Sequence, residues 1–361
     1  MLRIVSSAIA MVVFTAAAQA QAPAGYPADY GTLIAAAKKE GRVVVYATTD
    51  AVAASPLIKD FQAAFPGITV DYSDLNSTEL YNRYIAEVAA GSTGDVLWSS
   101  AMDLQVKLAA DGNAATYASP EIPSLPKWAV WENKAYGTTY EPITFVYNKR
   151  LLPAADVPAD HSALLNLLTT RTDAYKGKVA AYDPEKSGVG YLFVNQDVKY
   201  FPQAWDLFKA FGKVNIKLYT SAGAMIERVT SGEHAIAYGI FGSYALGRSK
   251  KVPNLGIVTP KDYTLVTSRV AFISTKAKNP NAAKLFLDYL LSKRAQTIIA
   301  NQAELYSLRD DVEGEATVKK VAELIGDKVR PVPIGPELLT NLDETKRLAF
   351  LKQWQAAMKG Q

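Results

Sequence analysis

The sequence of 361 residues contains no cysteine and only two histidines, His161 and His234. The absence of cysteine excludes disulfides, thiolate nucleophiles, iron–sulfur clusters and zinc sites built on cysteine. A serine–histidine–aspartate triad would depend on one of the two imidazoles. His161 opens a predicted helix over 162–169 and His234 begins a predicted buried strand, so a structural role is favoured for both. We therefore expect a binding protein and not an enzyme.

The sequence also has little net charge, because 39 Lys and Arg side chains oppose 35 Asp and Glu side chains, giving +4. This balance argues against a concentrated basic face, so we expect no nucleic-acid partner. Hydrophobic residues make up 49% of the chain and charged residues 20%. A chain of this length and composition is too apolar for disorder and predicts one or two globular domains.

Long hydrophobic runs are absent except at the N-terminus, where Arg3 precedes an apolar stretch over 4–18. The motif Ala18-Gln-Ala20 is typical of a signal-peptidase site, which predicts a cleaved signal peptide over 1–20, with residue 22 as the alternative end. The stretch is shorter than the roughly 20 residues that span a bilayer. A lipid anchor would need a cysteine at the cleavage point. We therefore expect a soluble periplasmic protein without a lipid anchor.

Strands alternate with helices in two parts of the sequence, a pattern that predicts an α/β fold with mainly parallel sheets. The expected strands lie at 42–47, 68–72, 95–98, 143–147, 178–182, 216–219 and 234–240. The expected helices lie at 56–65, 76–90, 102–110, 202–211, 221–230 and 281–292. A further apolar segment over 263–275 is interrupted by Arg269, and 113–137 is expected to be an ordered loop region.

Small hydroxyl and glycine residues follow several of the predicted strands. Ligands of parallel sheets bind beyond the carboxyl ends of the strands. The residues at these ends are Thr48, Thr49, Asp50, Ser99, Ser100, Ser187, Gly188, Ser221, Gly223, Ser243 and Tyr244. One interpretation is ordinary capping of the helices that follow. The other is that hydroxyls and free N–H groups bind one small polar ligand, most naturally an anion, with Arg269 adding charge and Arg228 or Lys186 less favoured.

Several segments resemble a known family when they are taken in order. They lie at 43–49, 94–100, 146–148, 220–233, 281–292 and 305–312. With the export signal, they resemble the periplasmic substrate-binding proteins of bacterial ABC importers, in extracellular solute-binding family 1 near the ferric-ion-binding proteins. The resemblance implies a two-lobed periplasmic-binding-protein fold of type II with an interlobe cleft. The expected lobes are 23–142 plus 272–322 and 148–267 plus 323–361, joined by hinge strands at about 143–147 and 268–274.

The resemblance also implies how the protein works. A receptor of this kind captures a small-molecule solute in the cleft by hinge closure and delivers it to an inner-membrane permease through a transient contact. We expect a monomer without a cofactor, and a phosphorylated, phosphonate or carboxylate solute. Docking on a sensor receptor in place of a permease stays open.

The ferric-binding relatives hold iron with a histidine, a glutamate and two adjacent tyrosines. At the corresponding positions this sequence has Asp50, Ser100 and the pair Ser243-Tyr244. Iron(III) prefers anionic oxygen ligands, whereas hydroxyls suit an oxyanion. The alternative is a receptor for iron(III) or another metal ion that uses Asp50, Glu141 and Tyr244. A secreted hydrolase is less favoured, because it would need a base beside one of the cleft serines and neither histidine lies near a serine-containing strand-end loop in the sequence.

Overall fold

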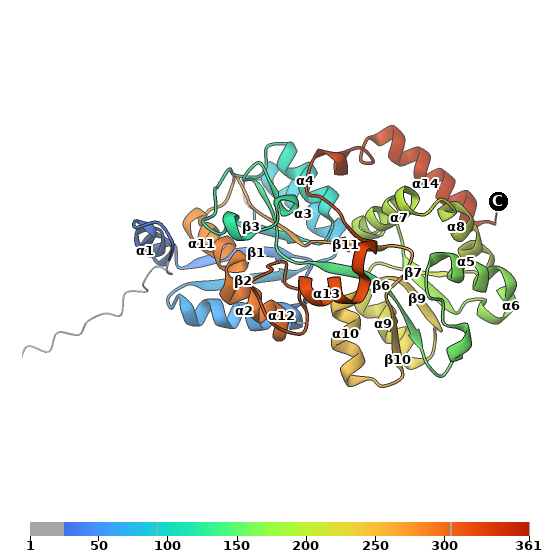
Figure 1. Cartoon of the computed structure of the whole chain (residues 1–361). Helices are drawn as coiled ribbons and strands as arrows, with labels where there is room; N and C mark the ends of the chain where they lie inside the picture. Colours follow the sequence, from blue (N-terminus) through green and yellow to red (C-terminus); the bar gives the residue numbers. More distant parts are fainter. Residues whose placement is uncertain (1–24, 92, 304, 361) are drawn as a thin grey trace, which may run out of the picture.

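The computed structural model describes residues 25–91, 93–303 and 305–360. The predicted signal peptide over 1–20, with its alternative end at 22, lies outside the described residues. The described chain forms two α/β lobes that lie side by side, each built around one sheet (Figure 1). Among the described helices, none combines the length and hydrophobicity that crossing a membrane requires.

The first lobe contains a sheet in the order β2-β1-β3-β12-β5-β4. Its strands are β1 Arg42–Ala47, β2 Thr69–Asp74, β3 Val96–Ser99, β4 Val130–Trp131, β5 Ala135–Gly137 and β12 Val270–Ile273. Its helices are α1 Tyr30–Glu40, α2 Ala51–Ala64, α3 Ser77–Ala89, α4 Met102–Ala110, α11 Pro280–Leu291 and α12 Lys293–Asn301. Strand β1 pairs with β2 and β3 in parallel. Val43 and Val45 enter one core and Tyr46 the other, so β1 is buried on both faces, as its continuous apolar run predicts.

The second lobe contains a sheet in the order β13-β11-β6-β9-β7-β8, with β10 paired to β6. Its strands are β6 Glu141–Asn148, β7 Val179–Tyr182, β8 Lys217–Tyr219, β9 Ile236–Phe241, β10 Leu255–Val258, β11 Thr264–Thr267 and β13 Val329–Pro331. The remaining helices are α5 His161–Thr170, α6 Thr172–Tyr175, α7 Gly188–Tyr200, α8 Ala204–Lys213, α9 Ala222–Ser231, α10 Gly242–Lys251, α13 Val318–Ile325 and α14 Glu344–Met358. Short 3₁₀ helices are η1 Ile122–Ser124, η2 Lys127–Ala129, η3 Ala154–Asp156, η4 Gly326–Lys328 and η5 Pro336–Leu339.

The chain passes between the lobes at two adjacent segments, 138–140 between β5 and β6, and 268–269 between β11 and β12. Thr138 N donates to Arg269 O at 2.9 Å, and Arg269 N donates to Thr139 Oγ1 at 2.9 Å. Of the two segments expected to form the hinge, 143–147 lies inside β6 in the second sheet. The other, 268–274, begins at the crossing and continues as β12 in the first sheet.

The C-terminal segment contacts both lobes. After β13, Ile334 N donates to Trp128 O at 2.9 Å, beside the first lobe, and η5 contacts α4. The segment then returns to the second lobe, where α14 packs on α8 with the Trp354 and Phe208 rings 5.1 Å apart. This path is the dark red ribbon in Figure 1. Residues 329–358 therefore form a third link between the lobes, in addition to the two crossings.

The structure differs from the sequence-based expectation at several elements, among them α2, α7 and the segment 263–275. The segment 113–137, expected to be an ordered loop region, contains β4 and β5. Helix α2 begins at Ala51, so Pro56 lies inside it and not in its first turn. Helix α7 was not expected, because residues 188–197 are all buried and show no one-sided apolar stripe. The segment 263–275 is divided at Arg269 into β11 and β12, which belong to different sheets. By contrast, the predicted capping box of α3 is confirmed, with Glu79 N donating to Asn76 Oδ1 at 2.9 Å.

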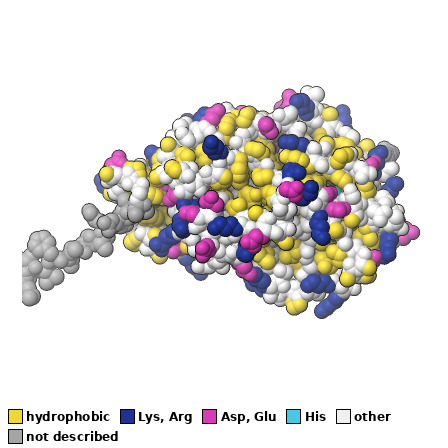
Figure 2. Space-filling model, viewed as in Figure 1, with side chains coloured by type: hydrophobic (Ala, Val, Ile, Leu, Met, Phe, Trp, Pro, Cys, Tyr) yellow, Lys and Arg dark blue, Asp and Glu magenta, His cyan; other side chains and the backbone are white. Residues whose placement is uncertain are grey.

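Charged side chains of both signs are interspersed on the face of the molecule that Figure 2 shows. Ion pairs form at the surface of the described chain, such as Arg83 with Glu87 at 2.8 Å and Lys107 with Asp111 at 2.9 Å. This mixed surface agrees with the small net charge of the sequence.

Asp103 on α4 gives the stability of the first lobe a pH dependence. The side chain is 3% exposed, and burial raises its pKa to about 7, although the N–H of Leu104 partly opposes the shift. The folded protein therefore keeps this proton to a higher pH than the unfolded chain does. Its contribution to stability is complete at pH values below the ordinary aspartate pKa and is lost as the pH rises through about 7.

Asparagine does not ionise, so replacing Asp103 by asparagine removes the loss of stability that occurs as the pH rises. The pKa of Asp103 rises from an ordinary value near 3.8 to about 7. Because each pKa unit corresponds to about 1.4 kcal/mol, we expect Asp103→Asn to raise the free energy of unfolding by about 4 kcal/mol at pH 8. At pH 4 we expect little change. Urea denaturation of both proteins at the two pH values measures this difference. An equal gain at both pH values would contradict the assignment.

Candidate functional site between the lobes

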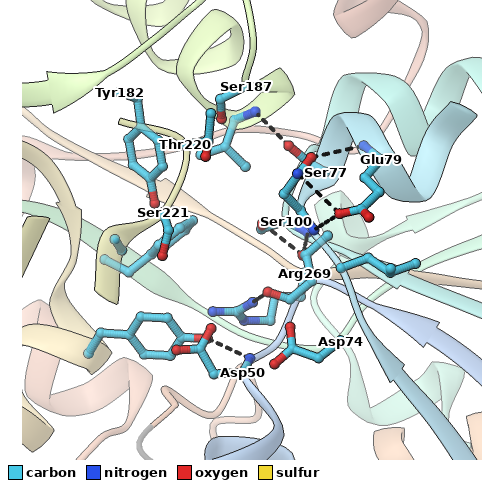
Figure 3. Close-up of a pocket in the computed structure, with 17 residues that line it drawn as sticks. Asp50, Asp74, Ser77, Glu79, Ser100, Tyr182, Ser187, Thr220, Ser221 and Arg269 are labelled. Carbon is cyan, nitrogen blue, oxygen red and sulfur yellow. Dashed lines mark hydrogen bonds between the residues drawn. The ribbon is translucent and has the colours of Figure 1, made fainter. Parts of the chain in front are cut away.

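A pocket of about 180 Å³ lies between the lobes at the carboxyl ends of the strands (Figure 3). Its first-lobe wall comes from the ends of β1, β2 and β3, and its second-lobe wall from the ends of β7, β8 and β9. The lining residues are Thr48, Asp50, Asp74, Leu75, Asn76, Ser77, Glu79, Ser100, Tyr182, Ser187, Val189, Thr220, Ser221, Ala222, Phe241, Tyr244 and Arg269. The strand ends of both lobes therefore converge on one cavity, which is the arrangement that an α/β fold uses to bind ligands.

Some of the candidate residues from the sequence line this pocket and others do not. Those that line it are Thr48, Asp50, Ser100, Ser187, Ser221, Tyr244 and Arg269. Those outside the lining are Thr49, Ser99, Gly188, Gly223 and Ser243. Ser99 Oγ accepts from Ala101 N at 3.2 Å, and the Thr49 carbonyl accepts from Tyr72 Oη at 2.5 Å. Both residues therefore form hydrogen bonds within the first lobe. Ser243 is buried at 2% exposure.

Other lining residues were not among the candidates. They are Asp74, Leu75, Asn76, Ser77, Glu79, Tyr182, Val189, Thr220, Ala222 and Phe241. Asp74 is the last residue of β2, and the next four residues in this list follow that strand. The end of β2 was not among the predicted site positions, although β2 is parallel to β1. Tyr182 and Phe241 are the last residues of β7 and β9. Applying the strand-end rule to every parallel strand would have found most of them.

Two hydroxyl groups at the base of the pocket are bonded to each other. Thr48 Oγ1 and Ser100 Oγ lie 3.0 Å apart, and Ser100 N donates to Thr48 Oγ1 at 2.9 Å. Ser100 is buried at 4% exposure. These bonds fix the two hydroxyls at the ends of neighbouring strands, so that they face the cavity in a defined position.

Hydroxyl groups on the opposite wall cap helices. Ser187 Oγ accepts from Gly190 N at 3.1 Å at the start of α7, and Ser221 Oγ accepts from Ala224 N at 3.4 Å at the start of α9. The capping interpretation therefore holds for both serines. A hydroxyl that accepts a hydrogen bond still has its own O–H to donate, so capping does not exclude a contact with a ligand oxygen.

Arg269 lies at the centre of the lining, as Figure 3 shows. Its side chain is 1% exposed, and Nη1 donates to Thr48 O at 3.2 Å. Nε is 3.6 Å from Glu141 Oε1, beyond hydrogen-bonding distance, and Nη2 has no hydrogen-bond partner among the described residues. The guanidinium carbon is 5.2 Å from the ring centroids of both Phe241 and Tyr244. Arg269 is thus a buried cation at the pocket, and its Nε and Nη2 donate to no described residue.

Glu141 lies behind Arg269 and does not line the pocket. Its side chain is fully buried, and burial raises its pKa, whereas the nearby Arg269 lowers it. Burial by itself would lower the pKa of Arg269, but Tyr244, Glu141 and Asp50 outweigh it and the pKa of the guanidinium is raised. Arg269 therefore keeps its positive charge inside the protein.

Carboxylates occupy the rim of the pocket. Asp50, Asp74 and Glu79 are exposed, in contrast to the buried Ser100 and Arg269. Asp74 Oδ2 accepts from Ala51 N at 2.9 Å, and burial together with the neighbouring Asp50 raises the pKa of Asp74 above its ordinary value. The pocket therefore has a positive base and a negative rim.

The lobes touch each other around the pocket. Asp50 N of the first lobe donates to Tyr244 Oη of the second at 3.1 Å, and Val189 N donates to Ser77 Oγ at 3.4 Å. Gly188 lies so close to the first lobe that a Cβ atom there would be 2.6 Å from Leu104 Cδ1. The two lobes are therefore in direct contact beside the cavity in this structure.

The other titratable candidates lie away from the pocket. His161 Nδ1 is 2.8 Å from Asp262, and His234 Nε2 is 2.7 Å from Tyr219 Oη. Lys186 and Arg228 form ion pairs with Asp183 and Glu233. Of the alternative metal set, Asp50 and Tyr244 line the pocket and Glu141 does not. The described residues contain no group of three or more histidine, aspartate or glutamate side chains arranged to hold a metal ion.

Comparison with known proteins places this geometry in a family. The model of the bacterial extracellular solute-binding proteins matches residues 56–325. A curated protein of Haemophilus influenzae is 29% identical over 143 residues, and the match spans only 41% of that relative. The crystal structure of a substrate-binding protein of an ABC transporter from Agrobacterium tumefaciens is 39% identical, covers 88% of this chain and 94% of that chain, and superimposes with a TM-score of 0.84.

Two more distant structures share the fold. AfuA from Actinobacillus pleuropneumoniae, with exogenous fructose-6-phosphate bound, is 20% identical and covers 89% of this chain and 99% of its own, with a TM-score of 0.73. Iron-bound HitA from Pseudomonas aeruginosa is 22% identical and covers 88% and 99%, with a TM-score of 0.67. The expected type II periplasmic-binding-protein fold is thereby confirmed. The chain belongs to the family of bacterial extracellular solute-binding proteins.

Proposed function

We propose that this protein is the periplasmic receptor of an ABC importer, which captures a small polar solute between its lobes and delivers it to the membrane permease. The observation that carries the proposal is the buried Arg269 guanidinium, whose Nη2 has no partner among the described residues, at a cavity lined by both lobes. A solute there holds the lobes together because it contacts both of them. The contact with the permease is transient, and the receptor acts as a monomer without changing its solute.

The solute carries an oxyanion. Arg269, Thr48 and Ser100 on one side, with Ser187 and Ser221 on the other, supply the donors that a phosphate, phosphonate or carboxylate accepts. The fructose-6-phosphate bound by AfuA supports this assignment on the same fold. The iron(III) alternative gains less support, because Glu141 is separated from the cavity by Arg269 and the second-lobe pair is Ser243-Tyr244.

Native mass spectrometry of the protein purified from its own periplasm tests the proposal. We expect a co-purifying solute that is released on denaturation. Ser100→Ala is expected to weaken its binding about tenfold, because one hydrogen bond to a charged group is worth about 1.5 kcal/mol or more. Ser55→Ala, a hydroxyl on α2 outside the pocket, is the matched control. Failure to recover any solute, or equal retention of a recovered solute by both variants, would contradict the proposed function.

A further inference from the structure

The charges around the interlobe pocket are separated by depth. The buried base contains one guanidinium, Arg269, and the exposed rim contains Asp50, Asp74 and Glu79. Glu79 is occupied at its own helix end, where Oε2 accepts from Asn76 Nδ2 at 3.2 Å. Asp50 and Asp74 remain as a pair. They lie on the same side of Arg269 in Figure 3, opposite Ser187 and Thr220.

The fold brings the two aspartates together. Strands β1 and β2 are parallel neighbours with Ala47 opposite Asp74, so the loop that carries Asp50 begins beside the end of β2. Backbone N–H groups position both residues: Ala51 N donates to Asp74, and Asp50 N donates to Tyr244. Burial and the nearby charge of Asp50 raise the pKa of Asp74 above its ordinary value, so the two side chains interact electrostatically.

A solute with only negative charge fits this arrangement poorly. Its oxyanion would be stabilised by Arg269, but the remainder would lie against two carboxylates, with Glu141 adding a third acidic group behind the arginine. A cationic group at the rim removes this repulsion and pairs with both aspartates.

We infer that the solute is a small zwitterion, with an oxyanion held at Arg269 and an ammonium group held between Asp50 and Asp74. This inference rests on the proposed function, because it names the class of solute for the same pocket. The rim aspartates then select a zwitterion over an anion. An anion without the ammonium group binds more weakly, although its contacts at the base of the pocket are unchanged.

Matched probe pairs test the inference by calorimetric titration. In each pair one member has an ammonium group where the other has a methyl group: O-phosphoethanolamine against propyl phosphate, taurine against propanesulfonate, and β-alanine against butyrate. In at least one pair we expect the ammonium member to bind tenfold or more tightly than its isostere. Asp74→Asn is expected to reduce that ratio to about threefold or less. Asp71→Asn, on the same strand but outside the pocket lining, is expected to preserve it.

The outcomes separate the inference from the function on which it rests. A pair in which the ammonium member binds more tightly, with the preference lost in Asp74→Asn and kept in Asp71→Asn, supports the inference. Equal binding within every pair, tighter binding of the methyl members, or no binding by any probe overturns it. A co-purifying solute that carries only negative charge also overturns it, but leaves the receptor function intact. Absence of any solute contradicts the function itself.

Discussion

Replacing Arg269 by methionine is expected to abolish measurable solute binding and to lower the free energy of unfolding by about 3 kcal/mol. The binding loss follows because the guanidinium is the one positive group in the described pocket lining and its Nη2 has no hydrogen-bond partner among the described residues. The stability loss follows because Glu141, 3.6 Å from Arg269 Nε and fully buried, would lose its counter-charge. Calorimetric titration with the co-purified solute and urea denaturation measure the two effects.

Two further variants separate binding from folding. Arg269→Met combined with Glu141→Gln removes both charges, and we expect it to recover much of the stability and none of the binding. Arg309→Met is the matched control, because Arg309 is also buried and paired with carboxylates, Glu121 and Asp311, but lies outside the pocket. It is expected to destabilise the protein with no change in affinity. Full affinity in Arg269→Met would refute the assignment of the oxyanion site.

Replacing Gly188 by valine is expected to weaken solute binding tenfold to a hundredfold while the free protein keeps its stability. A Cβ atom at residue 188 would lie 2.6 Å from Leu104 Cδ1 and 3.3 Å from both Ala101 Cβ and Ser77 Oγ, all in the other lobe. The crowding arises only when the lobes are together. Overpacking costs about 1–3 kcal/mol, so it opposes closure by that amount.

Small-angle X-ray scattering and titration test this expectation together. We expect Gly188→Val to keep a larger radius of gyration than the unchanged protein at the same solute concentration. Adding Leu104→Ala makes room for the new side chain and is expected to restore most of the affinity, whereas Leu104→Ala alone leaves it near the original value. Unchanged affinity in Gly188→Val would show that the glycine is not needed at the interface.

Local signals in the sequence predicted the elements that depend on local interactions. The apolar run 42–47 became β1, and the spacing of Asn76 and Glu79 predicted a capping box that the structure contains. No range was predicted for helix α7 from the sequence, because residues 188–197 are all buried and the helix lacks amphipathic periodicity. Pattern alone does not distinguish such a helix from other buried segments.

The candidate site was harder to predict residue by residue. Ser99 and Ser100 are adjacent, yet only Ser100 lines the pocket, and no sequence pattern decides which of two neighbours faces a cavity. Arg269 approaches Glu141 although the two residues are 128 positions apart, because β11 pairs with β6 in the second sheet. This contact therefore depends on the tertiary fold. Asp74 could have been predicted, because β2 is parallel to β1 and ligands bind beyond the carboxyl ends of parallel strands.

The two ends of the described chain belong to different lobes. Helix α1 packs on α11 in the first, whereas α14 packs on α8 in the second, and Figure 1 shows them at opposite sides of the molecule. A rotation that opens the cleft between the lobes is therefore expected to change the separation of these two helices. A donor dye on α1 and an acceptor dye on α14 would convert that rotation into a fluorescence signal without touching the cavity, which makes the fold a ready scaffold for an optical metabolite sensor.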